Sequence, residues 1–129
     1  MMAGAIPNTR NAMSDVMQRK WSELAERYED LASDLELLRS LASLCRRLSV
    51  YESKVFGYTS MHTLVLTQQE HVYPIHSTVP QLRVEPDQAK GIFAIEFGPL
   101  GDKRNRSREI GPDGLGPIVE NWLRDLNWI

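Results

Sequence analysis

Two carboxylates in the second half of the chain are spaced so that they could serve as an acid–base pair. Glu85 ends one predicted strand and Glu96 lies within the next, so a hairpin would bring the two side chains near each other. Paired carboxylates can pass protons to and from a substrate. Both side chains also fit the solvent face of a half-exposed sheet, and no nucleophile motif accompanies them. We therefore expect no catalytic residues and a chain that is not an enzyme.

The histidines, the cysteine and the glycines do not form a pattern that predicts a metal or cofactor site. His71 and His76 are five residues apart, which places them on opposite faces of a strand, and the third histidine is His62. Cys45 is the sole cysteine, so it cannot form an intramolecular disulfide or a cysteine-rich zinc site. The glycines near the C-terminus lack the spacing of a dinucleotide-binding fingerprint. We expect no metal and no cofactor.

A basic cluster lies in the segment 98–116, which we predict to be a long loop. The residues of the cluster are Lys103, Arg104, Arg106 and Arg108. Such a cluster can contact an anion or the surface of a partner. A solvated loop explains the same pattern, because no aromatic residue lies among the four for base stacking and acidic residues flank them. The cluster is a candidate contact site, and nucleic acid is not an expected partner.

The overall charge also argues against binding to polyanions. The chain has 129 residues, with 15 Lys and Arg against 17 Asp and Glu, which gives a formal charge of -2. No stretch approaches the roughly 20 apolar residues that cross a bilayer, and residues 1–13 lack the apolar run of an export signal. Together with the single cysteine, this predicts a soluble intracellular protein, cytoplasmic or nuclear, with no membrane partner.

The elements that must position these residues fall into two groups, and the first is a helical arm at residues 14–56. This segment contains neither glycine nor proline, and apolar residues recur at alternating spacings of three and four, as in the seam of a coiled coil. From Leu35 onward a second apolar stripe widens the face. The predicted association seam consists of Met17, Trp21, Leu24, Tyr28, Leu31, Leu35 and Leu38. We expect this seam to pair with a protein partner or with a second copy of the chain.

The same pattern fits an arm that folds back into a helical hairpin. Ser33 with Glu36, and Ser49 with Glu52, match the capping-box pattern that begins a helix. The bulk of Trp21 also suits a hairpin or a mixed bundle better than a tight parallel dimer. Intermolecular pairing and the monomeric hairpin therefore both remain open.

The second group of elements is a small α+β head at residues 57–129, preceded by the arm and by a flexible N-terminus at residues 1–13. Alternating or apolar runs predict strands at 60–67, 70–76, 80–85 and 91–97, and Gly116 and Pro117 mark the start of a C-terminal helix. The predicted fold class is thus α+β, with a long N-terminal helical arm, a mainly antiparallel sheet of three or four strands, and a C-terminal helix.

One short motif resembles a known domain type. Tyr73-Pro74, followed by Pro80 before a strand, is similar to the Tyr-Pro-x-x-x-Pro element of RWD-type domains, although five residues separate the two prolines here instead of three. The resemblance implies a non-catalytic adaptor subunit that heterodimerises through the arm. We expect a protein-interaction or scaffold module. The alternatives are a small inhibitor or immunity-type protein that blocks an enzyme, and an RWD-like adaptor of a larger complex.

Overall fold

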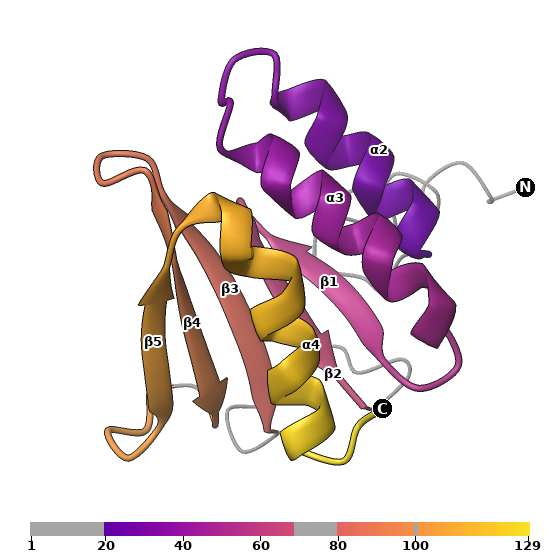
Figure 1. Cartoon of the computed structure of the whole chain (residues 1–129), viewed down its shortest axis with the longest axis vertical. Helices are drawn as coiled ribbons and strands as arrows, with labels where there is room; N and C mark the ends of the chain where they lie inside the picture. Colours follow the sequence, from indigo (N-terminus) through magenta and orange to yellow (C-terminus); the bar gives the residue numbers. More distant parts are fainter. Residues whose placement is uncertain (1–19, 69–79, 100) are drawn as a thin grey trace, which may run out of the picture.

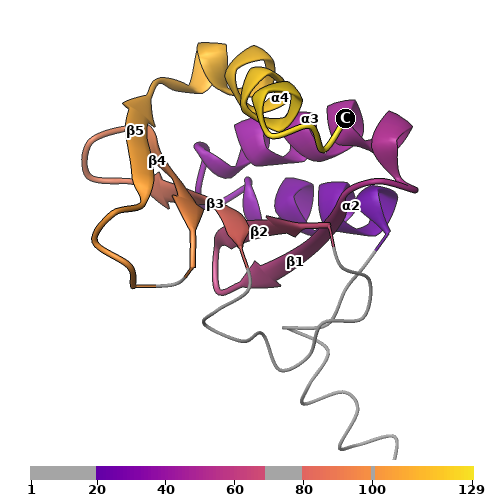
Figure 2. The ribbon, with the colours of Figure 1, turned by 90° about the horizontal axis from the view of Figure 1, so that it is seen from below.

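The computed structural model describes residues 20–68, 80–99 and 101–129, and these form a sheet with helices on one side of it (Figure 1). The described helices are α2 (Trp21–Leu31), α3 (Leu38–Leu48) and α4 (Leu115–Asp125), with short 3-10 turns at Ser49–Tyr51 and Pro112–Gly114. Viewed along the sheet, all three helices lie on the same face (Figure 2). The described part of the chain therefore has two layers, helix on sheet.

The sheet is an antiparallel meander whose strands are neighbours in the order of the sequence. Its strands are β1 (Phe56–Ser60), β2 (Thr63–Thr67), β3 (Gln81–Asp87), β4 (Ile92–Gly98) and β5 (Arg106–Ile110). Side chains alternate between the two faces of a strand, so each strand divides its residues between the helices and the opposite face. The residues that face the helices include Leu64, Leu66, Leu82, Val84, Phe93 and Ile95, all of them buried.

The predicted long helical arm is wrong. Helix α2 ends at Leu31, and the chain turns back so that α3 runs beside it in the opposite direction, both against the sheet (Figure 1). Ser33 does not cap the next helix, since its hydroxyl donates to the Asp30 carbonyl at 3.1 Å. The physical reason is that the chain's own sheet and helices cover the apolar stripes. A single long helix would leave the wide face after Leu35 exposed to water.

The predicted number of strands is also too low, because the sheet has five. Residues 60–67, predicted as one strand, contain a two-residue turn at Met61 and His62 that joins β1 to β2. Met61 adopts a φ of 56°, and the Tyr28 hydroxyl donates to the His62 carbonyl at 3.1 Å. Strand β5 lies inside the segment predicted as a loop. The predicted strand 70–76 and the flexible N-terminus lie outside the described residues.

Strand β5 escapes a hydrophobicity pattern because charged residues occupy its helix-facing positions. Arg106 lies over the ring of Trp122, with its guanidinium carbon 4.0 Å from the ring centroid. Only Ile110 of this strand is buried. In the described part of the chain β5 pairs with β4 alone, so it is an edge of the sheet. By contrast, the predicted β3–β4 hairpin is confirmed, each strand within two residues of the expected bounds, and the C-terminal helix begins within two residues of its predicted start.

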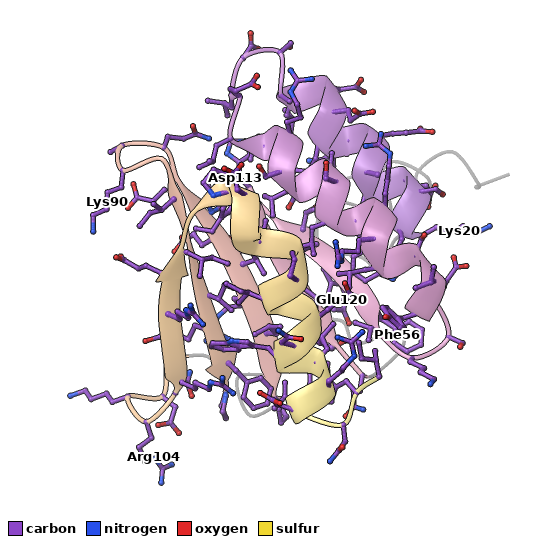
Figure 3. All side chains as sticks on the ribbon, in the orientation of Figure 1. Lys20, Phe56, Lys90, Arg104, Asp113 and Glu120 are labelled. Carbon is purple, nitrogen blue, oxygen red and sulfur yellow. The ribbon has the colours of Figure 1, made fainter. Side chains whose placement is uncertain are left out.

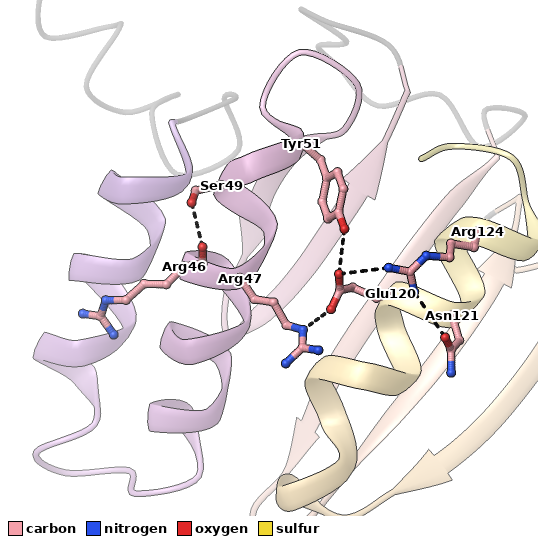
Figure 4. Close-up of polar contacts among 7 residues, drawn as sticks. All are labelled: Arg46, Arg47, Ser49, Tyr51, Glu120, Asn121 and Arg124. Atoms are coloured by element: carbon pink, nitrogen blue, oxygen red, sulfur yellow. Dashed lines mark hydrogen bonds and ion pairs between the residues drawn. The ribbon is translucent and has the colours of Figure 1, made fainter.

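A buried carboxylate joins α4 to α3. Glu120 accepts hydrogen bonds from the Arg47 Nε and from the Tyr51 hydroxyl, the latter at 2.7 Å, and Arg124 lies 3.6 Å away (Figure 4). Burial acts to raise the pKa of Glu120. The hydrogen bonds from Arg47 and Tyr51, with the charges of Arg47 and Arg124, outweigh burial and hold the pKa below its ordinary value.

This network makes stability depend on pH. Because the pKa of Glu120 is lower in the folded chain, its contribution is present above the unfolded pKa of about 4.3 and is lost as the pH falls through the folded value. We expect Glu120→Gln to lower the free energy of unfolding by about 1–2 kcal/mol at pH 7. Urea denaturation between pH 3 and pH 7 measures this. The gap between wild type and variant should shrink below about pH 4, and a gap that stays constant would contradict the assignment.

Candidate functional site

A cavity of about 460 Å³ lies on the face of the sheet opposite the helices, which we call the pocket face. The described residues that line it are Ser60, Thr63, Val65, Gln81, Arg83, Glu85, Ala94 and Glu96. Six of the eight side chains are polar or charged, and they come from β1, β2, β3 and β4. The volume falls within the range of about 300–1,000 Å³ that is usual for ligand sites.

The register of the strands places Arg83 near the centre of the pocket face. Arg83 is directly opposite Val65 on one side and Glu96 on the other, and Glu96 is in turn opposite Ser107 on β5. Because opposed residues of antiparallel strands project to the same face, these four side chains form one row across the sheet. The alternation of β3 adds Gln81 and Glu85 to the same face.

Arg83 and Glu96 form an ion pair in the pocket, and each is also held by a hydrogen bond. The Arg83 Nη2 lies 3.0 Å from the Glu96 Oε2, and its Nη1 donates to the Gly98 carbonyl at 3.2 Å. The Asn105 Nδ2 donates to the same Glu96 oxygen and to the Pro99 carbonyl, each at 2.7 Å. The Arg83 side chain is only 11% exposed. The pair is therefore oriented by contacts from both sides.

Gln81 is the most unusual residue of the pocket. It is 2% exposed, and its Nε2 has no hydrogen-bond partner in the part of the chain that the structure describes. A buried donor without a partner destabilises a folded protein by about 1–3 kcal/mol, so such groups are rare. Gly98 is opposite Gln81 in the register and contributes no side chain that could accept a hydrogen bond. The amide of Gln81 is therefore a donor that a bound group could satisfy.

The two carboxylates that the sequence singles out, Glu85 and Glu96, both line this pocket. Sequence reasoning missed Gln81 and Arg83 as site residues. A signal was present in β3, where Gln81, Arg83 and Glu85 occupy every second position and alternate with the apolar Leu82 and Val84. Because Arg83 is charged and Gln81 carries a polar amide, the sequence alone predicts that both side chains are exposed to solvent.

The basic cluster does not form a single surface. Arg104 lies at the tip of the turn between β4 and β5, where it points away from the body (Figure 3), and it pairs with Asp102 at 2.9 Å. That ion pair holds the pKa of the Asp102 carboxyl below its usual range. Arg106 packs on Trp122, and Arg108, two residues on, shares its face of the strand. Lys103 is exposed in the turn.

The predicted association seam is part of the chain's own core. Trp21, Leu24, Tyr28 and Leu38 are buried, and Leu31 and Leu35 are partly buried against the same cluster. Met17 lies outside the described residues. These side chains pack in α2 and α3 toward each other and toward the sheet, so they are not available to a second chain in this fold.

The other reactive residues that the structure describes do not gather into a site. Cys45 is buried, and burial raises the pKa of its thiol, which opposes thiolate formation. Within residues 20–68, 80–99 and 101–129, no group of three or more histidine, cysteine or acidic side chains is placed to hold a metal ion. His71, His76 and the Tyr73-Pro74 motif lie outside the described residues.

No helix in the described ranges is both long and apolar enough to pass through a bilayer. A comparison of the chain with protein-family models, with curated proteins and with solved structures finds no match.

Proposed function

We propose that this chain is a non-enzymatic protein-binding module that docks its partner on the pocket face. The observation that carries the proposal is the buried Gln81 amide, which lines a cavity and whose Nε2 has no hydrogen-bond partner within the described ranges. A binding module tolerates such a group because the bound partner supplies the missing acceptor. The oriented Arg83–Glu96 pair beside it supports the same conclusion, since fixed polar groups give a binding surface its specificity.

Association through the arm is no longer part of the proposal, because α2 and α3 bury the seam residues against the sheet. An inhibitor or immunity-type protein remains compatible, since it would cover an enzyme with the same face. An RWD-like adaptor would rest on Tyr73-Pro74, which the structure does not describe. An intracellular location, in cytoplasm or nucleus, stays an expectation from the single cysteine.

A proton-transfer enzyme is the second candidate, and one observation favours it, namely that Glu85 and Glu96 line one cavity. Against it, Arg83 and Asn105 both engage the Glu96 Oε2, the oxygen that would have to exchange a proton. Ser60 lines the same cavity and Ser107 is opposite Glu96 in the register, but among the described residues neither hydroxyl forms a hydrogen bond with Glu85 or Glu96. We therefore prefer binding to catalysis.

The proposal is tested by photo-crosslinking from two positions. Ser107 lies in the central row of the pocket face, whereas Val50 is exposed in the 3-10 turn that follows α3. A benzophenone amino acid is placed at either position in the full chain, which is then irradiated in an extract of the source cells. We expect a discrete adduct from position 107 and not from position 50.

Gln81→Leu provides the matched control for that experiment. It has a similar volume and lacks the amide, so it should weaken the adduct from position 107 about five-fold or more while the circular dichroism spectrum is kept. Equal adducts from both positions, or an adduct that ignores Gln81→Leu, would show that the pocket face is not the docking surface.

A further inference from the structure

The groups around the cavity define which chemistry could satisfy Gln81. Its Nε2 requires an acceptor oxygen, because the described residues offer none. Arg83 is already engaged by Glu96 and by the Gly98 carbonyl, so it is not a free cation. Glu85 and Glu96 line the same cavity and can accept hydrogen bonds from a ligand. The Arg83 Nη2, although 3.0 Å from the Glu96 Oε2, is likewise buried and has no hydrogen-bond partner among the described residues. The site therefore presents two donors that one acceptor oxygen could satisfy, with acceptors nearby.

The charges of the lining residues decide between a neutral and an anionic acceptor. Glu85 and Glu96 outnumber the single cation Arg83, so the described lining carries a net negative charge. A carboxylate would satisfy Gln81 but would be repelled by the two acidic side chains. A simple cation would pair with the acids but would leave Gln81 without an acceptor. A carboxamide has both the oxygen for Gln81 and N–H groups for the carboxylates.

From these contacts we infer that the pocket recognises a carboxamide and discriminates against a carboxylate of the same shape. The carboxamide oxygen accepts from the Gln81 Nε2, and its nitrogen donates to Glu85 or Glu96. Val65 and Ala94 line the cavity where the aliphatic part of the group would lie. The inference rests on the proposed function, since the carboxamide is an asparagine or glutamine side chain of the protein partner.

The test uses propionamide, which copies the end of a glutamine side chain, and propionate as its charged isostere. Each is titrated into the full chain, labelled with nitrogen-15, while the side-chain amide signals of Gln81 are followed by NMR. We expect saturable shifts with propionamide and a dissociation constant about five-fold or more higher for propionate. Gln81→Leu should abolish propionamide binding, followed then through the backbone signals of β3, whereas Val50→Ala, at an exposed position away from the pocket face, should leave it unchanged.

A second variant keeps the test decisive if Gln81→Leu does not fold. Glu85 is exposed, so Glu85→Gln should fold, and by removing one negative charge it should improve propionate binding several-fold while changing propionamide binding less. Equal or tighter binding of propionate to the wild-type chain would overturn the inference. So would propionamide binding that survives Gln81→Leu.

A competition experiment separates this inference from the proposed function. Excess propionamide should reduce the adduct from position 107 if the partner inserts a carboxamide. If the adduct depends on Gln81 but propionamide does not bind, the pocket face docks a protein by other chemistry and the carboxamide inference fails alone. If propionamide binds selectively while no adduct forms, the pocket is a site for small amides, and the protein-binding function fails.

Discussion

Replacing Trp21 with alanine is expected to destabilise the folded chain by about 3–5 kcal/mol, the range for removing a large aromatic side chain from a core. Trp21 is 2% exposed, and its Nε1 donates to the Val55 carbonyl at 3.1 Å. Its ring lies over Gly57, where a Cβ atom would be 2.7 Å from the Trp21 Cη2. The variant therefore loses both apolar contacts and a buried hydrogen bond. Urea denaturation followed by circular dichroism measures the loss.

The same measurement distinguishes a core residue from a seam residue. If Trp21 packs inside one chain, the loss should be the same at low and high protein concentration, because no association is involved. Leu31→Ala is the matched control, since Leu31 shares the predicted seam but is only partly buried, and it should cost less. If Trp21→Ala lowers the free energy of unfolding by less than about 1 kcal/mol, or if the loss grows on dilution, Trp21 lies in an intermolecular interface and not in the core.

Replacing Gly98 with alanine is the second large expected effect, a loss of about 2–4 kcal/mol. Gly98 has a φ of +134°, which residues with a Cβ atom rarely adopt, and the new Cβ would lie 1.9 Å from the Asn105 Oδ1. Moving Asn105 would also break its hydrogen bond to Glu96. The variant should therefore loosen the Arg83–Glu96 pair as well as the β4–β5 connection. Thermal or urea denaturation measures the loss.

Two other glycines separate backbone strain from steric overlap. Gly101 has a φ of +81° and no atom within 4 Å of a built Cβ, so Gly101→Ala should cost only the strain, about 1 kcal/mol. Gly111 has a φ of -76° and open space, so Gly111→Ala should be neutral or slightly stabilising. In a chain that also carries Asn105→Ala, Gly98→Ala should lower the free energy of unfolding less than it does in the wild-type chain. Equal losses for Gly98→Ala and Gly101→Ala would contradict the steric overlap with Asn105.

The sequence predicts the β3–β4 hairpin well because its information is local. Leu82 and Val84 alternate with polar residues, and the larger apolar residues Phe93 and Ile95 hold every second position of the next strand, a pattern that suits few arrangements other than a hairpin packed on one face. The helical arm failed for the opposite reason. Spacings of three and four mark an apolar face on any helix, whether its neighbour is another chain or the same chain's sheet. Gly57, which admits the Trp21 ring to β1, carries no signal of that contact in the sequence.

Some properties of the candidate site could likewise be predicted from local sequence, and others could not. That Gln81 and Arg83 share a face with Glu85 follows from strand alternation and could be predicted. That Gln81 is buried without a hydrogen-bond partner among the described residues, and that Asn105 donates to Glu96, depends on how β3, β4 and the β4–β5 turn meet. Such properties arise from tertiary packing, which no local pattern encodes.

The charged edge strand has a consequence for how molecules of this protein meet each other. A strand with only one neighbour presents free backbone groups, which invite the edge of another molecule to pair and extend the sheet. In β5, Arg106 and Arg108 project from one side and Glu109 from the other, and Glu109 lies 3.4 Å from Lys90. An incoming strand would have to bury these charges. The same arginines that make β5 unrecognisable as a strand from hydrophobicity thus disfavour edge-to-edge aggregation of the sheet.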